Sequence, residues 1–180
     1  CEIQKQERVS SQSTQLLVKT QSVNHHDQIL PVQDSLVRPV LYSQTVSLKS
    51  LPVQDKINKF VDLMLPAILV AKYNLEKKRQ FVVEQIQKDN ITLTDSIKLN
   101  DLLIEYKSES LSELEQKLHT HPVSIVLAQA ALESGWGTSQ LFLNANNIFG
   151  VCSFNSSEPR VEYQQDGKSV YYRQYTDLSL

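Results

Sequence analysis

The chain has little cysteine and little glycine: two cysteines and four glycines in 180 residues. Two cysteines, Cys1 and Cys152, cannot build the disulfide framework of a small secreted domain. No stretch is rich enough in glycine to mark a flexible linker, and no internal repeat is visible. A chain of this length can bury one good hydrophobic core, so we expect a single core.

Excess charge and long apolar runs are also missing. The formal net charge is −2, which excludes the basic footprint of a nucleic-acid-binding protein. The longest apolar run, residues 63–71, is interrupted by Pro66. It falls short of the roughly 20 residues that a helix needs to span a bilayer. The sequence therefore predicts neither a nucleic-acid partner nor a membrane-spanning helix.

Residues 1–50 are rich in Gln, Ser, Thr and Val and show neither helical nor sustained strand periodicity. We interpret them as a polar tether, largely disordered or extended, with short apolar pieces such as 16–18 that could pack on the body. The chain opens on Cys1 without a Met, as a mature bacterial lipoprotein would, or because the numbering merely starts there. The lipoprotein interpretation predicts a lipid anchor on Cys1 and a location in the cell envelope.

Residues 51–118 show helical patterns. Apolar residues recur every three to four positions over 55–87, although Pro66 must kink or restart that helix. Thr94 can cap a following helix that ends near residue 106, and Ser110 with Glu113 forms a capping box for a short one. After residue 150, Asp166-Gly167 between aromatic-rich runs predicts a β-hairpin. The fold class is therefore mainly α with one small hairpin.

The most informative segment is residues 129–139, QAALESGWGTS. It follows an apolar helix that begins after Pro122, so we expect that helix to be buried most of the way round. Desolvation and the negative end of the helix dipole would both favour a protonated Glu133, the form that a general acid needs. The alternative is a solvated or ion-paired carboxylate at an ordinary helix end.

Residues 129–139, followed by Asn-Asn-Ile-Phe-Gly at 146–150, resemble the motifs of bacterial glucosaminidases of glycoside hydrolase family seventy-three. The Bax-like proteins of that family are the most similar group, and residues 60–69 resemble their upstream helix. The resemblance covers residues 50–180. It implies a lysozyme-like α+β fold with a small β-hairpin lobe, and a catalytic core at 119–180. The segment 175–180 resembles the start of a further family helix, so we expect this core to continue beyond it.

The resemblance also implies that Glu133 is the general acid for cutting glycosidic bonds in peptidoglycan. Glycosidases generally use a second carboxylate. Glu162 is the best candidate, since a Glu-Tyr pair occupies the same hairpin in many family members, and a solvent-facing strand residue is the alternative. Asp166 is explained by its turn, and Glu158 lies in a loop before Pro159.

Sugar recognition needs flat apolar faces together with amide and hydroxyl groups. Trp136 is the single tryptophan and lies beside Glu133. Asn146 and Asn147 could bind an N-acetyl group or stabilise the turn at Gly150 instead. Core packing and buried hydrogen bonding are the alternatives for the other candidates. The predicted substrate contacts are Gln129, Trp136, Asn147, Phe149, Tyr172 and Tyr175.

A metal site is poorly supported by the sequence. His119 and His121 lie on opposite sides of an extended segment without a third ligand in a suitable pattern, and His25-His26 falls in the expected tether. Cys152 has neither a CxxC partner nor a basic cluster beside it. We therefore expect no metal and no cofactor.

Three functions remain. The first is an endo-β-N-acetylglucosaminidase that hydrolyses peptidoglycan as a monomer. The second is a lytic transglycosylase, although Asn-Asn-Ile-Phe-Gly replaces the Gly-Leu-Met-Gln expected of that class. The third is a non-catalytic envelope protein that binds glycan.

Overall fold

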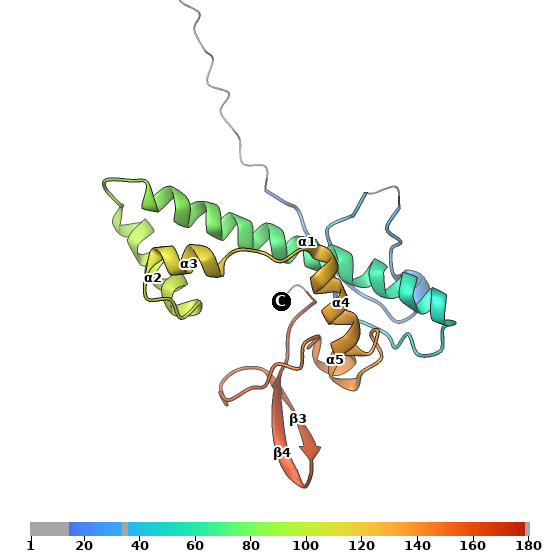
Figure 1. Cartoon of the computed structure of the whole chain (residues 1–180). Coiled ribbons are helices and arrows are strands. Elements are labelled where there is room, and N and C mark those ends of the chain that lie inside the picture. The colour runs from blue at the N-terminus through green and yellow to red at the C-terminus, as the bar shows by residue number, and fades with distance from the viewer. Residues whose placement is uncertain (1–14, 34–35, 179–180) are drawn as a thin grey trace, which may run out of the picture.

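The structure is a computed structural model that describes residues 15–33 and 36–178 of the chain. Its longest element is helix α1 (Val53–Ile86), along which the other elements are arranged (Figure 1). The described residues form five α-helices, a short 3-10 helix and two small two-stranded sheets, which confirms a mainly helical class with some β-structure. None of the helices in these ranges is long and apolar enough to cross a membrane.

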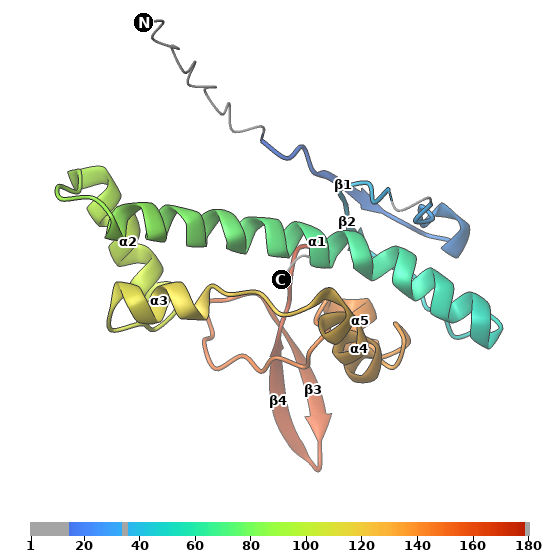
Figure 2. The same ribbon diagram turned by 45° about the horizontal axis from the view of Figure 1, so that its top comes forward.

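Helix α1 continues through Pro66. Proline removes one backbone hydrogen bond and crowds the preceding turn, which bends a helix at that point. Figure 2 shows that the axis of α1 changes direction between its two halves, so the helix is bent and does not restart. The two halves of α1 support two different clusters of buried side chains.

The first half of α1 carries the main core. Strands β1 (Lys19–Ser22) and β2 (Val40–Gln44) pair in parallel on one side of it, and helices α4 (Val123–Ser134) and α5 (Gln140–Ala145) lie on the other (Figure 2). The fully buried side chains of this core come from helices α1, α4 and α5 and from the segments that follow the two strands: Val23, Ile29, Leu48, Phe60, Leu63, Ala130 and Phe142.

The described part of residues 1–50 differs from the predicted tether. Val23, Ile29 and Leu48 are each 0% exposed, and Tyr42 accepts a hydrogen bond from the Leu30 amide at 3.0 Å. Widely spaced apolar residues reach the core here through loops and a two-stranded sheet, so no periodic pattern revealed them. Residues 15–33 and 36–50 are thus part of the folded body, whereas Cys1, the predicted lipid site, lies outside the described residues.

The second half of α1 packs against α2 (Leu93–Glu105) and α3 (Leu111–Lys117). Val82, Leu114 and Leu118 are fully buried between these helices. Arg79 on α1 also donates a hydrogen bond to Glu115 on α3 at 2.6 Å. An extended linker then leads from α3 back to α4, next to the main core (Figure 2).

Strands β3 (Arg160–Gln165) and β4 (Lys168–Arg173) form the predicted hairpin. Asp166 and Gly167 both have positive φ angles, +51° and +74°, as a type I′ turn requires. The hairpin projects from the body below α5 in Figure 1. Its base is fixed to that helix, since the Tyr175 amide donates a hydrogen bond to the Ala145 carbonyl at 2.9 Å.

Candidate functional site

Helix α4 ends in an unusual turn. Gly135, Trp136 and Gly137 all adopt positive φ angles, +58°, +58° and +73°. The Trp136 amide donates a hydrogen bond to the Ala131 carbonyl at 2.8 Å, which closes the helix end. A left-handed backbone is costly for a residue with a Cβ atom, and such residues are concentrated at functional sites. The turn thus holds the chain's single tryptophan in a strained conformation three residues after Glu133.

Ser134 stabilises this turn from inside. Its side chain is 0% exposed, its hydroxyl donates to the Ala130 carbonyl at 2.6 Å, and the same oxygen accepts from the Gly137 amide at 3.1 Å. Its carbonyl accepts hydrogen bonds from the amides of Thr138 and Ser139. The sequence motif did not predict a role for Ser134, although its place between Glu133 and the helix-ending Gly135 was a signal for one. Ser134 therefore fixes where Glu133 and Trp136 point.

Gly137 packs this turn onto the main core. A Cβ atom there would lie 3.3 Å from Phe60 Cδ2 and 3.5 Å from Leu48 Cδ1. Gly167 in the hairpin turn has nearly the same φ angle, but no atom would lie within 4 Å of a Cβ atom added there. Substitution of Gly167 by Ala therefore measures the cost of the backbone strain without any crowding.

We expect Gly137→Ala to lower the free energy of unfolding by about 1–3 kcal/mol more than Gly167→Ala, because only the first substitution adds crowding to the strained φ angle. Urea unfolding of both variants measures the difference. An equal decrease in the free energy of unfolding of the two variants would show that close packing at Gly137 does not contribute to stability.

Helix α4 is less buried than the sequence predicted. Only Ala130, Ala131 and Ser134 are buried, while Leu132 is 79% exposed and Ile125 is 49% exposed. The helix packs one face on α1, and no described element covers the opposite face, so apolar composition alone overestimated its burial. The apolar surroundings predicted for Glu133 are therefore not present in the described chain, and its side chain is exposed.

Glu133 lies at the border of the packed face of α4. It follows Val126 by seven residues and Gln129 by four, so the three side chains share one flank of the helix. Val126 is partly buried against the main core, whereas Gln129 and Glu133 are exposed. Seven residues of helix span about 10 Å, which is the separation of Val126 and Glu133 along the axis.

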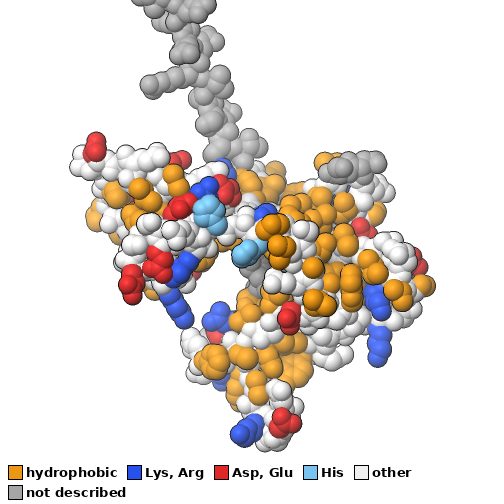
Figure 3. All heavy atoms as spheres, in the orientation of Figure 1, with side chains coloured by type: hydrophobic (Ala, Val, Ile, Leu, Met, Phe, Trp, Pro, Cys, Tyr) orange, Lys and Arg blue, Asp and Glu red, His pale blue; other side chains and the backbone are white. Residues whose placement is uncertain are grey.

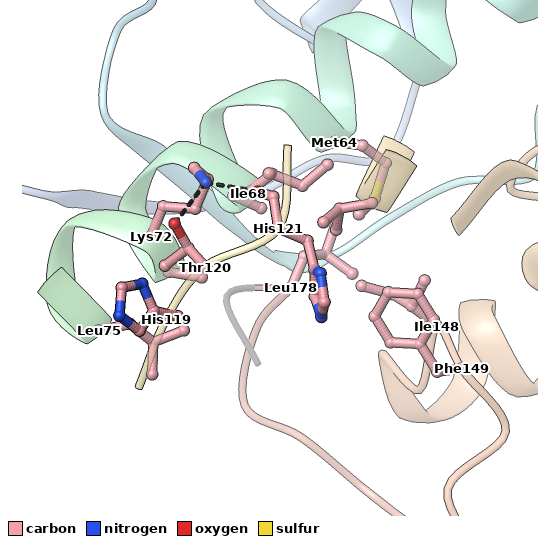
Figure 4. Close-up of a pocket in the computed structure, with 13 residues that line it drawn as sticks. Met64, Ile68, Lys72, Leu75, His119, Thr120, His121, Ile148, Phe149 and Leu178 are labelled. Atoms are coloured by element: carbon pink, nitrogen blue, oxygen red, sulfur yellow. Dashed lines mark hydrogen bonds between the residues drawn. The ribbon is translucent and has the colours of Figure 1, made fainter. Parts of the chain in front are cut away.

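Val126 and Phe149 line an apolar cavity of about 160 Å³ between α1 and α4 (Figure 4). One wall is the linker before α4, which Lys72 holds to α1. Its ammonium group donates hydrogen bonds to Thr120 Oγ1 at 2.7 Å and to the His121 carbonyl at 2.5 Å. Phe149 is 37% exposed at the cavity, so its ring can meet a ligand from one side.

Trp136 is partly exposed beside the turn. Its indole packs edge-on against Phe60 with centroids 5.6 Å apart, and the residue remains 37% exposed. Partly exposed aromatic rings held from behind are typical stacking platforms. Trp136 therefore combines a fixed position with an accessible surface beside Glu133.

Asn147 has a different role from the predicted substrate contact. It is 1% exposed, and its amide group donates to the Val151 and Arg173 carbonyls at 2.9 and 2.8 Å. Its oxygen accepts from the Val151 amide at 2.9 Å. The neighbouring Asn146 donates to the Ser43 and Tyr175 carbonyls at 2.9 and 3.0 Å. Both side chains stabilise backbone turns, the alternative considered above, and this use of the Asn147 amide argues against direct sugar binding.

Glu162 lies on the face of the hairpin that points away from α5. Tyr163 accepts a hydrogen bond from Asn144 of α5 at 3.3 Å, and its ring packs edge-on against Tyr172 with centroids 5.9 Å apart. Glu162 points to the other face, because neighbouring strand residues alternate. Its carboxylate is exposed and accepts hydrogen bonds from Gln164 and Ser169 of the same hairpin.

Two of the predicted aromatic contacts are half-buried near the base of the hairpin. Tyr172 pairs with Val161 across the hairpin. Tyr175 follows β4 and lines a polar depression between α5 and β2. Neither this depression nor the apolar cavity includes Glu133 or Glu162 in its lining. The structure therefore groups Gln129, Glu133 and Trp136 at the end of α4, and places both tyrosines and Glu162 on the hairpin.

Glu158, which its place in a loop before Pro159 gave no reason to single out, has a carboxylate fixed by two other side chains. It accepts hydrogen bonds from Ser153 Oγ at 2.7 Å and from Arg173 Nε at 3.2 Å. The hydrogen bond from Ser153 and the positive charge of Arg173 lower the pKa of Glu158 below its ordinary value of 4.5. Glu158 thus stays ionised and fastens the loop of residues 153–158 to β4.

This lowered pKa predicts a pH dependence of stability. A carboxylate with a lower pKa in the folded chain stabilises it at pH values above the unfolded pKa, and this contribution is lost as the pH falls below 4.5. We expect Glu158→Gln to melt at a lower temperature than wild type near neutral pH, with the gap closing in acid. Thermal unfolding at several pH values measures it, and a gap that does not change with pH would contradict the assignment.

The space-filling view shows a notch between the part of the molecule built from α2 and α3 and the hairpin (Figure 3). The end of α4 and the base of the hairpin lie on the other side of this notch in the same orientation (Figure 1). A polymeric substrate needs an open groove of this kind, because its chain continues on both sides of the bond that is cut.

Comparison with known proteins connects this region with a family. A family model described as mannosyl-glycoprotein endo-beta-N-acetylglucosaminidase matches residues 108–179. The exo-glucosaminidase LytG of Bacillus subtilis is 45% identical over 58 residues, which cover 32% of this chain and 20% of that protein. Protein bax of Escherichia coli is 27% identical over 100 residues, or 51% of this chain and 36% of that protein. No solved structure matches the chain.

The matched region contains α4 and its turn, both asparagines of residues 146–147 and the hairpin, which are the parts that carry the candidate site. The chain spans only a minor part of the length of each of these two relatives. The resemblance found in the motifs is confirmed for residues 108–179, which match the glucosaminidase family, and the similarity to LytG and to protein bax supports a Bax-like glycoside hydrolase.

Proposed function

We propose that the chain hydrolyses the glycan strands of peptidoglycan at N-acetylglucosamine, as an endo-β-N-acetylglucosaminidase with Glu133 as general acid. The observation that carries this proposal is the arrangement at the end of α4. There, an exposed carboxylate precedes a rigid turn that presents the half-exposed Trp136. A glycosidase needs this combination, because an acid must reach the leaving oxygen while an aromatic face holds the sugar.

The position of Glu133 suits a polymeric substrate. Its side chain is open to solvent at the flank of α4, and the buried Ser134 fixes the backbone next to it. Phe149 lies at the apolar cavity on the same side of α4 as Val126. An N-acetyl or lactyl methyl group of the glycan would find an apolar contact there. In this proposal the region has a lysozyme-like fold, with the helix end and the hairpin lobe on either side of the glycan.

Glu162 is the proposed second carboxylate, which positions water or stabilises the positive charge at the anomeric carbon. Its hydrogen bonds to Ser169 and Gln164 hold it on the exposed face of the hairpin. In this proposal Tyr175 contacts the glycan from the hairpin side and Gln129 from the α4 side. Tyr172 lies on the face of the hairpin opposite to Glu162, which argues against its contact with the same sugar.

A lytic transglycosylase is the second candidate. It is favoured by the hydrogen bonds that Glu162 accepts from Gln164 and Ser169 of its own hairpin. If these bonds keep Glu162 from the substrate, Glu133 is the one carboxylate left for the reaction. A single carboxylate suffices when the substrate's own hydroxyl group closes an anhydro ring. The two candidates share Glu133 as the acid and differ in the group that attacks the anomeric carbon.

Location and assembly belong to the same proposal. Peptidoglycan lies in the cell envelope, so we place the chain there as a monomer, with a lipid on Cys1 as its contact with a membrane. Incorporation of a labelled fatty acid into wild type and Cys1→Ser, each expressed from the complete gene, tests the anchor. Label in both proteins, or in neither, would contradict it.

Digestion of purified peptidoglycan, followed by borohydride reduction and mass spectrometry, tests the proposed reaction. We expect products with reduced N-acetylglucosamine ends. Anhydro-muramyl ends would identify a transglycosylase, and the absence of products from folded protein would leave a glycan-binding module.

A further inference from the structure

The short 3-10 helix η1 (His26–Gln28) brings two imidazoles and one carboxylate together. Asp27 Oδ2 lies 3.1 Å from His25 Nδ1, and Asp27 Oδ1 lies 3.0 Å from His26 Nδ1. The two rings have centroids 4.1 Å apart. One ligand atom from each of the three residues lies within 4.8 Å of the other two. The three side chains therefore face a common point.

Asp27 lies between the two rings. One of its carboxylate oxygens faces His25 Nδ1 and the other faces His26 Nδ1, so Asp27 would supply the negative charge that a cation bound by two imidazoles needs. The Asp27 amide also donates a long hydrogen bond of 3.4 Å to His25 Nδ1, and this contact would be given up when an ion binds that nitrogen.

The turn that carries these ligands is held in place from several sides. Gln28 Oε1 accepts hydrogen bonds from the amides of Asn24 and His25 at 2.7 and 3.0 Å. Val23 and Ile29, on either side of the turn, are each 0% exposed. Ligands on a rigid turn lose little entropy when they bind an ion, which favours a functional site.

A depression of about 300 Å³ lies beside His26 and Asp27. Asp55 and Asn58 from the start of α1 line it and add oxygen atoms that could bind a metal-bound water. Lys59 also lines this depression, and its positive charge would repel a bound cation. Its ammonium group donates a hydrogen bond to the Ile29 carbonyl at 3.2 Å and lies 3.9 Å from Asp62. Because the ammonium group contacts Ile29 and Asp62, its positive charge is partly neutralised and held away from the three ligands.

We propose that His25, His26 and Asp27 bind a divalent transition metal ion of the zinc class, with water in the remaining position. Two ligands about 2.0–2.1 Å from a tetrahedral ion lie roughly 3.3 Å apart, close to the nitrogen–oxygen distances seen here. Imidazole nitrogen suits zinc, whereas calcium and magnesium prefer oxygen ligands throughout. The expectation of no metal rested on sequence spacing, which does not show that Asp27 folds back onto both rings.

A water on the bound ion would link η1 to Asp55 or Asn58 at the start of α1. This site is formed by residues before the region that matches the glucosaminidase family, so it does not depend on the proposed catalysis. Binding to the folded chain alone would raise its stability with metal concentration.

Isothermal titration of the full chain with zinc chloride tests the site, after the thiols of Cys1 and Cys152 have been alkylated so that they cannot bind zinc. We expect one equivalent to bind to wild type, and the affinity to fall at least about 10-fold in His26→Ala and Asp27→Asn. Asp27→Asn keeps the size of the side chain, and circular dichroism checks that both variants fold.

A variant with both His119→Ala and His121→Ala is the matched control, since it removes the other two imidazoles of the chain. It should bind zinc with an affinity within about twofold of wild type. The absence of zinc binding to wild type would overturn the proposal. Unchanged affinity in Asp27→Asn, or loss of binding in the control variant, would do the same.

Discussion

Glu133→Gln is expected to lower peptidoglycan hydrolysis by about 10²–10⁴-fold, the range for loss of a general acid. The free energy of unfolding should change by no more than about 0.5 kcal/mol, because the side chain is exposed and the amide has the same shape. Release of soluble fragments from labelled peptidoglycan measures the rate, and thermal unfolding measures the stability.

Glu84→Gln provides the control for this substitution. It makes the same chemical change on an exposed residue of α1, in the half that packs on α2 and α3, and it should leave the rate unchanged. Glu162→Gln tests the second carboxylate in the same assay. A large stability loss in Glu133→Gln with a proportionate loss of activity would mean that Glu133 is structural.

Asn147→Ala is expected to have the largest effect on stability. The substitution removes three hydrogen bonds at 2.8–2.9 Å and leaves the Val151 amide and the Val151 and Arg173 carbonyls without this partner. The Val151 carbonyl still accepts from the Arg173 amide at 3.0 Å, so two backbone groups lose this partner without a replacement. At about 1–3 kcal/mol for each unsatisfied group, we expect a total loss of about 3 kcal/mol. For a chain of this size, 3 kcal/mol corresponds to a fall of roughly 6–12 °C in melting temperature.

Asn144→Ala is the matched control for Asn147→Ala. Asn144 is exposed, and its amide donates one longer hydrogen bond of 3.3 Å to Tyr163. We expect its loss to cost less than about 1 kcal/mol. Similar melting temperatures for the two variants would show that the buried amide does not hold the base of the hairpin.

Local patterns in the sequence predicted most of the local structure. Asp166-Gly167 gave the hairpin, and Gly135 ends α4, because each position requires a backbone conformation that few residues adopt. Ser110 caps α3 as predicted, accepting from the Glu113 amide at 3.2 Å. The helix cap predicted at Thr94 is instead Thr92, whose hydroxyl accepts from the Asp95 amide at 3.1 Å.

Features that depend on tertiary partners could not be predicted in this way. The sequence of α4 is apolar on nearly every side, yet Leu132 is exposed, because only the face toward α1 meets another helix. Asn147 presents the same amide whether it binds sugar or backbone, and only the fold brings the Arg173 carbonyl to it. Glu158 likewise gains its ion pair through the hairpin, 15 residues away in the chain.

The central claim is that Glu133 supplies the proton for cleavage at N-acetylglucosamine. Its most direct test is parallel digestion of one peptidoglycan preparation by equal amounts of folded wild type and Glu133→Gln, with the reduced ends counted by mass spectrometry. We predict N-acetylglucosaminitol ends from wild type and almost none from Glu133→Gln. Equal numbers of these ends from both proteins would contradict the claim.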